Sequence, residues 1–117
     1  MAKRQKRRPV AYQVLLEPRV HTQRRKLPGN VRQRVKRAIG ALAHDPRPHH
    51  SQELDLSGLK GQVTIPEGVE LRRLRLEHWR VLYAVDKDWQ AVTVLTVRRR
   101  PPYDYEDLEE LVTGLEA

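Results

Sequence analysis

The stretch ELRRLRLEHWRVLYAV, residues 70–85, decides the fold, because its apolar and charged residues alternate with the two-residue period of a β-strand. The alternation breaks at Glu77 and His78, where two polar residues follow each other. So short a break predicts a tight turn between two antiparallel strands, which we expect at residues 70–77 and 79–86.

The faces of this hairpin separate its leucines from its arginines. Side chains alternate across a strand, so Leu74 and Leu76 point to one side while Arg73 and Arg75 point to the other. Helices must cover the leucine side, which leaves the two arginines on the open face. The second strand divides in the same way, but the register of the turn leaves open which set faces the helices: Trp79, Val81, Tyr83 and Val85, or Arg80, Leu82 and Ala84.

Two further strands flank this hairpin in the sequence. Residues 90–97 are rich in valine and follow a short polar connection, so they extend the hairpin to an antiparallel meander. Residues 11–18, AYQVLLEP, predict a short buried strand that ends at Pro18.

Helical patterns occupy most of the rest. Pro18 suits the first turn of a helix over residues 19–27. Asn30 is a favourable N-cap for the next helix, which Pro46 and Pro48 terminate. The apolar stripe of that second helix consists of Val31, Val35, Ala38, Ile39 and Leu42. A last amphipathic helix presents Leu108, Leu111, Val112 and Leu115 on one side and acids on the other.

This order of elements predicts an α+β domain at residues 11–117, preceded by a basic flexible arm at residues 1–10. A sheet of about four strands supplies the apolar surface that the amphipathic helices need. The helices are expected on one face of this sheet, so that the other face stays free to meet a partner.

Charge points to the class of that partner. The chain has 117 residues and a net charge of +8, but residues 104–117 contain six acids and no Lys or Arg, so residues 1–103 carry +14. A body this basic attracts polyanions, above all nucleic acid, although a charged surface also serves solubility.

Cysteine is absent, which excludes disulfides, thiolate nucleophiles and cysteine-based metal sites and fits an intracellular protein. No apolar run approaches the length of a membrane span, and no secretory signal is expected.

Arginines gather near one edge of the expected sheet. The last strand ends in VRRR, residues 97–100, and in an antiparallel meander this end lies near Arg75 and Arg80. We therefore expect Arg75, Arg80, Arg99 and Arg100 to converge. Cations side by side repel one another, and a bound polyanion would relieve that repulsion. Ion pairs with acids of the last helix are the alternative interpretation.

With these features in order, the chain resembles the RelE/ParE toxin superfamily of type II toxin–antitoxin systems over residues 12–111. The segments that support the resemblance are YQVLLEP, the helical pair, LSGLKG, residues 70–85 and VTVLTVRRRPPYDYEDL. The signature is Arg73-x-Arg75 followed by Trp79-Arg80-x-x-Tyr83. The resemblance implies a twisted antiparallel sheet packed against an N-terminal helical hairpin, plus a C-terminal helix.

The resemblance also implies an activity. RelE-like members cut mRNA in the ribosomal A site without a metal or other cofactor, whereas ParE-like members inhibit DNA gyrase. In the RelE-like branch, the 2′-hydroxyl attacks the adjacent phosphate and leaves a cyclic phosphate. Transferred residue by residue, the phosphate- and RNA-binding positions are Arg73, Arg75, Arg98 and Arg99, and the catalytic positions are Arg80, Arg100, Tyr103, Tyr105 and His78.

The chain departs from the RelE pattern in one respect, since Arg73 and Arg75 stand where the best-studied branch has lysines. An arginine stays protonated and is a poor base, so both are better interpreted as phosphate clamps. Proton transfer then falls to His78 at the turn, or to Tyr103 or Tyr105. The pair His49 and His50 gives little support for a metal, because prolines surround it and no cysteine accompanies it.

The function favoured by these observations is a ribosome-dependent mRNA endonuclease, the cytoplasmic toxin of a toxin–antitoxin pair. Its expected partners are a cognate antitoxin protein, the ribosome and mRNA, with no membrane. A ParE-like gyrase inhibitor and a non-catalytic basic nucleic-acid-binding module are the alternatives.

Overall fold

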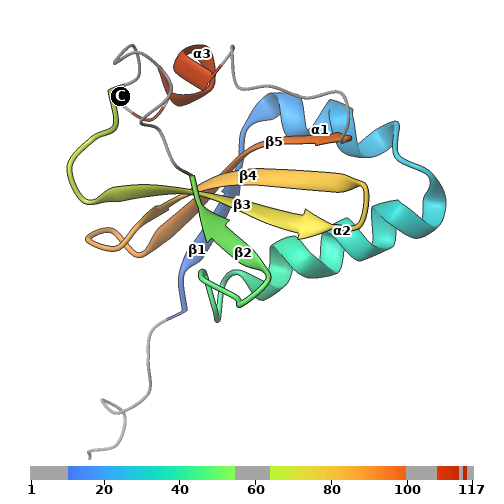
Figure 1. The fold of residues 1–117 in the computed structure, drawn as a ribbon, viewed down its shortest axis with the longest axis horizontal. Coiled ribbons are helices and arrows are strands. Elements are labelled where there is room, and N and C mark those ends of the chain that lie inside the picture. The colour runs from blue at the N-terminus through green and yellow to red at the C-terminus, as the bar shows by residue number, and fades with distance from the viewer. Residues whose placement is uncertain (1–10, 55–63, 100–107, 114, 116–117) are drawn as a thin grey trace, which may run out of the picture.

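Five strands form one sheet in the computed structural model, which describes residues 11–54, 64–99, 108–113 and 115 (Figure 1). The strand order is β1-β5-β4-β3-β2. In chain order the elements are β1 (Gln13–Leu16), α1 (Pro18–Arg25), α2 (Gly29–Ala41), β2 (Ser51–Glu53), β3 (Val69–Leu76), β4 (Trp79–Asp86), β5 (Ala91–Arg99) and α3 (Leu108–Thr113). The α+β class is confirmed, with one strand more than expected. The basic arm and the LSGLKG turn lie outside the described residues.

The central hairpin forms as the alternation predicts. All eight residues of β3 pair with β4, from Val69 opposite Asp86 to Leu76 opposite Trp79. Glu77 and His78 make the two-residue turn, in which Glu77 has a φ of +55°. Two-residue turns between twisted strands favour such left-handed backbone, because it matches the twist of the two strands.

Two features of the sheet differ from the expectation. The first strand, β1, pairs with β5 in parallel, so the sheet is mixed rather than antiparallel. It is also an edge strand, with Leu15 43% exposed, and not the buried strand that its sequence suggests. The extra strand, β2, is only three residues long and pairs with β3 at the opposite edge.

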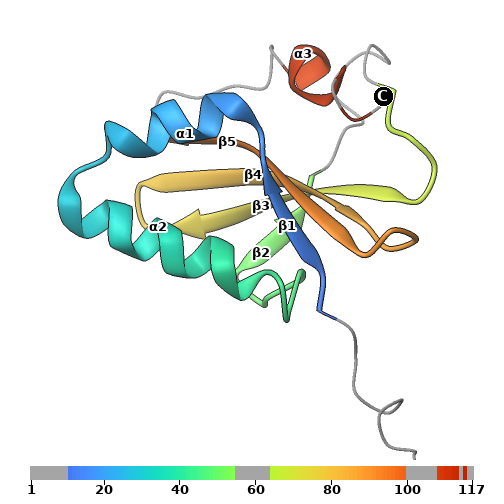
Figure 2. The same ribbon diagram turned by 180° about the vertical axis from the view of Figure 1, so that it is seen from behind.

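The two N-terminal helices form the expected hairpin, seen from behind in Figure 2. Pro18 occupies the first turn of α1, as predicted. The prediction that Asn30 caps α2 is wrong: Pro28 is the capping residue, and its carbonyl oxygen already accepts the first helical hydrogen bond, from Arg32 N at 2.8 Å. Asn30 therefore lies inside the first turn.

The larger core lies between this hairpin and one face of the sheet, which we call the helix face. The apolar stripe of α2 packs there as predicted, with Val35, Ile39 and Leu42 buried. Leu74 of β3 and Tyr83 of β4 also lie in this core. The β4 residues that face the helices are therefore Trp79, Val81, Tyr83 and Val85. The buried Tyr83 hydroxyl donates to Pro46 O at 2.8 Å. Burial raises the pKa of Tyr83, so the hydroxyl stays a donor.

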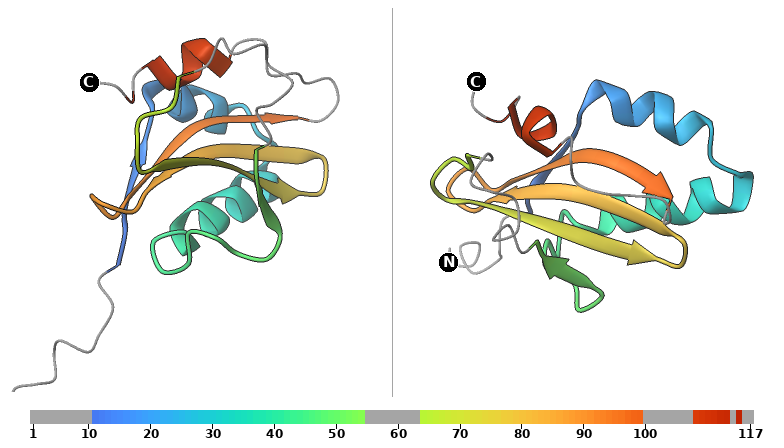
Figure 3. Two further views of the ribbon diagram at one scale, coloured as in Figure 1. Left: turned by 60° about the vertical axis from the view of Figure 1, so that its left-hand side comes forward. Right: turned by 45° about the horizontal axis from the view of Figure 1, so that its top comes forward.

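A smaller core lies on the opposite face and corrects the expectation that this face is entirely free. Leu111 and Val112 of α3 are buried there against β3, β4 and β5. The sheet residues of this core are Leu71, Leu82, Ala84 and Leu95. The left view of Figure 3 shows α2 and α3 on opposite sides of the sheet. Only the part of this face beyond α3 remains for the arginines.

The outer edge of β5 is completed by a side chain. Strand β1 ends opposite Val94, and beyond it the amide of Gln23 in α1 takes over the pairing. Val97 N donates to Gln23 Oε1 at 2.8 Å, and Gln23 Nε2 donates to the Thr96 hydroxyl at 2.9 Å. The amide side chain thus satisfies a buried backbone group where no described strand does.

One irregularity interrupts the pairing of β4 with β5. Tyr83 lies opposite Val94, whereas Leu82 lies opposite Thr96, so Leu95 is an extra residue and forms a β-bulge. Residues of β5 after the bulge are out of phase with those before it.

Among the described residues, no helix is both long and apolar enough to cross a membrane.

Candidate functional site

Three arginines form a row across the sheet on the face opposite α1 and α2. Arg75 of β3 lies directly opposite Arg80 of β4, and Arg80 lies directly opposite Arg98 of β5. Directly opposed residues share a face, and like charges in such pairs destabilise a sheet. With Arg73, which lies opposite Leu82, these residues define what we call the arginine face.

The row continues to the residue just before β2. Ser51 pairs with Leu74, so the preceding residue, His50, lies opposite Arg75. A backbone hydrogen bond marks this position, from Arg75 N to His50 O at 3.3 Å. In sheet order the row therefore reads His50, Arg75, Arg80 and Arg98.

A pocket of about 330 Å³ opens beside this end of the row. It is lined by His49, His50, Ser51, Gln52, Arg73 and Arg75. Arg73 is held at its wall, where Nη2 donates to Gln52 Oε1 at 2.8 Å. The Arg75 side chain is exposed, so its guanidinium is available to an incoming anion. The lining unites two imidazoles with two guanidinium groups, and none of its described residues is a carboxylate.

Arg80 differs from Arg75 in its burial, with only 4% of its surface exposed. Its Nη1 donates to Glu77 O at 2.7 Å and to Trp79 O at 2.9 Å. The side chain thereby fixes the β3–β4 turn while adding its positive charge to the centre of the row. Because its position is set by these bonds, Arg80 is a preorganised charge rather than a mobile one.

The C-terminal end of β5 contributes a different arginine than expected. The bulge at Leu95 brings Arg98 opposite Arg80, whereas Arg99 lies opposite Trp79, on the helix face. The prediction that Arg99 converges with Arg75 and Arg80 is therefore wrong. The other candidates in this segment, Arg100, Tyr103 and Tyr105, lie outside the described residues.

His78 occupies the second position of the β3–β4 turn and is exposed. It is not among the residues that line the pocket beside Arg73 and Arg75. Its neighbour Glu77 pairs with Arg34 of α2 at 3.0 Å, and this hydrogen bond lowers the pKa of Glu77. The turn is thus tied to α2, while the site that unites imidazole with arginine lies at the β2 edge.

Sequence reasoning missed His49 and His50, because it weighed them only as metal ligands. Their place beside Arg75 depends on β2, whose sequence, Ser-Gln-Glu, has none of the β-branched or aromatic residues that indicate a strand. No group of three or more His, Asp or Glu residues that could hold a metal occurs in the part of the chain that the structure describes.

Two other arginines, Arg47 and Arg72, are bound to the carboxylate of Glu70. Arg47 Nη2 lies 3.0 Å from Glu70 Oε1, and Arg72 Nη1 donates to Glu70 Oε2. Arg72 also donates from Nε to the Ser51 hydroxyl at 3.0 Å. Burial pushes the pKa of Glu70 upward, but the hydrogen bonds from Arg47 and Arg72 outweigh it and hold the pKa below its usual value.

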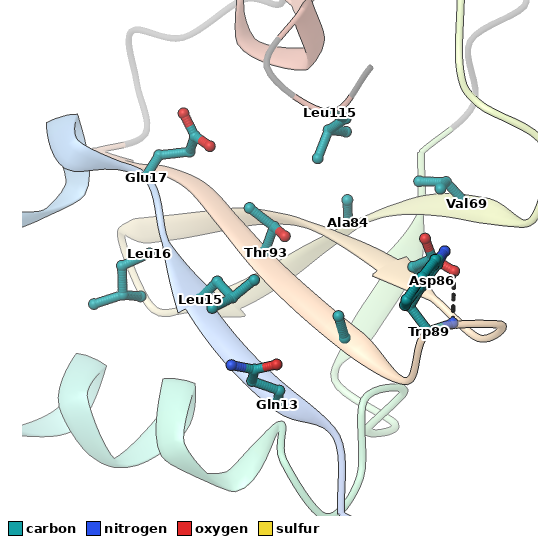
Figure 4. A pocket seen from close by; sticks show the side chains of 11 residues that line it. Gln13, Leu15, Leu16, Glu17, Val69, Ala84, Asp86, Trp89, Thr93 and Leu115 are labelled. Carbon is teal, nitrogen blue, oxygen red and sulfur yellow. Dashed lines mark hydrogen bonds between the residues drawn. The ribbon is translucent and has the colours of Figure 1, made fainter. Parts of the chain in front are cut away.

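A second pocket, of about 400 Å³, lies near the β1 edge of the sheet (Figure 4). Its walls are mostly apolar and include the exposed Leu15 and Trp89. Of its two carboxylates, Asp86 accepts hydrogen bonds from the backbone of the β4–β5 turn, including Trp89 N at 3.1 Å. None of the described residues that line this pocket is a cation, and it therefore suits an apolar group better than a phosphate.

A third pocket, of about 360 Å³, is lined by His21, Arg24, Arg25 and Arg32 of the helical hairpin. It is basic, but Arg32 donates from Nη2 to Leu27 O at 3.1 Å, which contributes to closing the loop between the helices. It contains no cross-strand row of opposed charges.

Comparisons with known proteins identify the fold. The chain aligns with the archaeal RelE in a RelE–RelB complex from Pyrococcus horikoshii with a TM-score of 0.66 and 21% identity, over 80% of this chain and 99% of the other. The Mycobacterium tuberculosis toxin–antitoxin complex RelBE2 gives 0.57 and 24%, over 80% and 95%. The isolated Escherichia coli RelE toxin gives 0.53 and 23%, over 90% and 99%.

Searches by sequence add nothing to this likeness. No protein-family model matches the chain, and no curated protein sequence matches it significantly. At these identities, what the structural comparisons establish is that the chain has the RelE fold.

Proposed function

We propose that this chain is the toxin of a type II toxin–antitoxin system and that it cleaves mRNA on the ribosome. The observation that carries the proposal is the row of Arg75, Arg80 and Arg98 on a sheet of the RelE fold. Three guanidinium groups gathered on one face concentrate positive charge, and a phosphodiester bound there would accept charge-assisted hydrogen bonds.

The cations have distinct parts in this proposal. Arg73 and Arg75 line the pocket and hold the phosphodiester that reacts. Arg80, held by the carbonyls of the β3–β4 turn, stabilises the negative charge that grows on the nonbridging oxygens in the transition state. Arg98 extends the positive surface toward the end of β5.

The reaction itself needs no metal in this scheme. The ribose 2′-oxygen forms a bond to phosphorus while the bond from phosphorus to the 5′-oxygen breaks. A base takes the proton of the 2′-hydroxyl, and an acid supplies a proton to the leaving 5′-oxygen. The products are a 2′,3′-cyclic phosphate and a 5′-hydroxyl end.

The proposed antitoxin is recognised by charge. A protein segment rich in Asp and Glu would cover Arg75 and Arg98, satisfy the row and exclude mRNA from it. Residues 1–103 carry a net charge of +14, which favours such an acidic partner at long range.

The test is cleavage of mRNA on purified, programmed ribosomes. The unsubstituted protein should cut within the A-site codon, and Arg75→Ala should cut about 10- to 100-fold more slowly because one phosphate clamp is lost. Arg37→Ala is the matched control, since it removes one exposed arginine of α2 and should change the rate by less than about twofold.

Two outcomes would contradict the proposal. Growth arrest with intact mRNA and trapped gyrase–DNA complexes would favour a ParE-like gyrase inhibitor, which an arginine-rich face without a strong base also fits. Binding of RNA without cleavage or growth arrest would indicate a non-catalytic module.

A further inference from the structure

We propose that His50 transfers the proton in RNA cleavage, with the pocket it shares with Arg73 and Arg75 as the seat of the reacting phosphodiester. This inference rests on the proposed nuclease function. It assigns the general acid–base group that an all-arginine row does not provide.

The sheet register puts His50 in the row. His50 is the turn residue just before β2, and the pairing of Ser51 with Leu74 and the hydrogen bond from Arg75 N to His50 O place its backbone opposite Arg75. The pocket lining agrees, because His50 and Arg75 border the same space of about 330 Å³. An imidazole here is adjacent to the guanidinium groups that would hold the substrate.

The backbone around His50 is fixed although its side chain is exposed. His50 O accepts from Arg75 N at 3.3 Å, which ties the residue to β3. Ser51 is bound to Pro48 O through both its backbone N, at 2.9 Å, and its hydroxyl, at 2.8 Å. A side chain on a pinned backbone is positioned for chemistry while it stays accessible to an RNA strand.

The chemistry of the lining supports this assignment. Of the six lining residues, only His49 and His50 carry an imidazole, the side chain that most often serves as a general acid or base. The two rings meet edge to face, with centroids 5.6 Å apart and an interplanar angle of 73°. We interpret His49 as a positioning residue, because it packs against the ring of His50.

The step balances whether the imidazole of His50 starts neutral, as the base, or protonated, as the acid. Neutral His50 accepts the proton of the 2′-hydroxyl as the bond from the 2′-oxygen to phosphorus forms. If His50 instead starts as imidazolium, it donates its proton to the 5′-oxygen as that oxygen leaves. Water or its ions exchange the other proton, so no further reactant is required.

The experiment compares single-turnover cleavage by the unsubstituted protein, His50→Ala, His50→Gln and His44→Gln on programmed ribosomes. Loss of a general acid–base group should slow cleavage by about 10²- to 10⁴-fold, with ribosome binding retained. Free imidazole should restore part of the activity of His50→Ala, which a merely structural role would not allow. His44→Gln, an exposed histidine outside the pocket, should keep the full rate.

The pH profile gives an independent readout. The rate of cleavage by the unsubstituted protein should depend on pH through the protonation of His50, and His50→Gln should lose this dependence. Cleavage by both His50 variants within about threefold of the unsubstituted rate would overturn the assignment. So would a slow His50→Ala that imidazole does not restore, or transfer of the whole effect to His78→Gln. If the unsubstituted protein cuts no mRNA at all, the proposed function and this assignment both fail.

Discussion

On the helix face, Arg72 lies opposite Tyr83 and donates to the carboxylate of Glu70. On the arginine face, three positions further along β3, Arg75 lies opposite Arg80. Arginine therefore has different neighbours on the two faces of one sheet. On the helix face Arg72 binds the carboxylate of Glu70, whereas on the arginine face Arg75, Arg80 and Arg98 stand directly opposite one another on neighbouring strands.

The two faces therefore differ in how their arginines contribute to the stability of the folded state. Cations paired with a half-buried carboxylate lower the free energy of the folded state. Cations stacked across strands raise it, and such a cost is typical of surfaces that bind a ligand of opposite charge. Substitutions on the two faces should therefore have opposite consequences.

The largest effect is expected from the core of the helix face. Leu74→Ala should lower the free energy of unfolding by about 3 kcal/mol, because it leaves a cavity under α2 at a residue that is 1% exposed. Urea denaturation followed by circular dichroism measures it. Arg75→Ala, at the next position on the other face, should stay within about 0.5 kcal/mol of the unsubstituted protein. Equal losses in the two variants would abolish the contrast between the faces.

The next effect concerns the outer edge of β5. Gln23→Ala should cost about 1 to 2 kcal/mol, because it removes the acceptor of Val97 N and the donor to Thr96. The control is Gln33→Ala, an exposed glutamine of α2. Amide hydrogen exchange of Val97 should become faster in Gln23→Ala alone. Unchanged protection would show that this side chain does not complete the edge.

A smaller and pH-dependent effect is expected at Glu70. Glu70→Gln should cost about 1 kcal/mol at pH 7, because the carboxylate that binds Arg47 and Arg72 is lost. The pKa of Glu70 is lower in the folded state than in the unfolded state, so its contribution is present above the unfolded pKa and is lost as pH falls through the folded pKa.

Chemical denaturation of both proteins between pH 7 and 3 measures this difference. It should shrink below about pH 4 and vanish when Glu70 is protonated in both states. Glu67→Gln, at an exposed turn, is the control that should show no such trend.

The smallest effect on stability is also the one that most sharply separates the faces. Arg75→Glu should raise the free energy of unfolding by about 0.5 kcal/mol, because it replaces a like-charge pair with Arg80 by an opposite-charge pair. The same substitution should weaken RNA binding and reduce its dependence on salt concentration. Arg37→Glu matches the change in charge without touching the row. A loss of stability in Arg75→Glu would mean that the arginines of this face are not in conflict.

The hairpin could be predicted from sequence because strand alternation and a two-residue turn are local signals. The parallel pairing of β1 with β5 could not, since it joins residues that are far apart in the chain. The three residues of β2 carry no strand propensity and form a strand only because β3 offers them an edge. The prediction of Asn30 as the N-cap of α2 failed because capping preference is a local signal, and the helix begins at Gly29, directly after Pro28.

The candidate site divides along the same line. The outward direction of Arg73 and Arg75 follows from alternation and is confirmed by the pairing of β3 with β4. The neighbourhood of His50 follows from β2, and the choice of Arg98 over Arg99 follows from the bulge. Neither has a sequence signal, because both depend on how one strand registers against another.

The bulge at Leu95 determines which face of the sheet each later side chain of β5 points to. With an unbroken register, Val97 would stand opposite Arg80, and Arg98 would stand opposite Trp79 on the helix face. One inserted residue gives Leu95 to the core beneath α3, returns Val97 to the larger core and delivers Arg98 to the row. Inserting or deleting one residue in β5 would thus move the side chains at its C-terminal end to the opposite face of the sheet. Lineages of such proteins could gain or lose a cationic surface by an indel of a single codon, while β1, α1 and the first half of β5 stayed as they are.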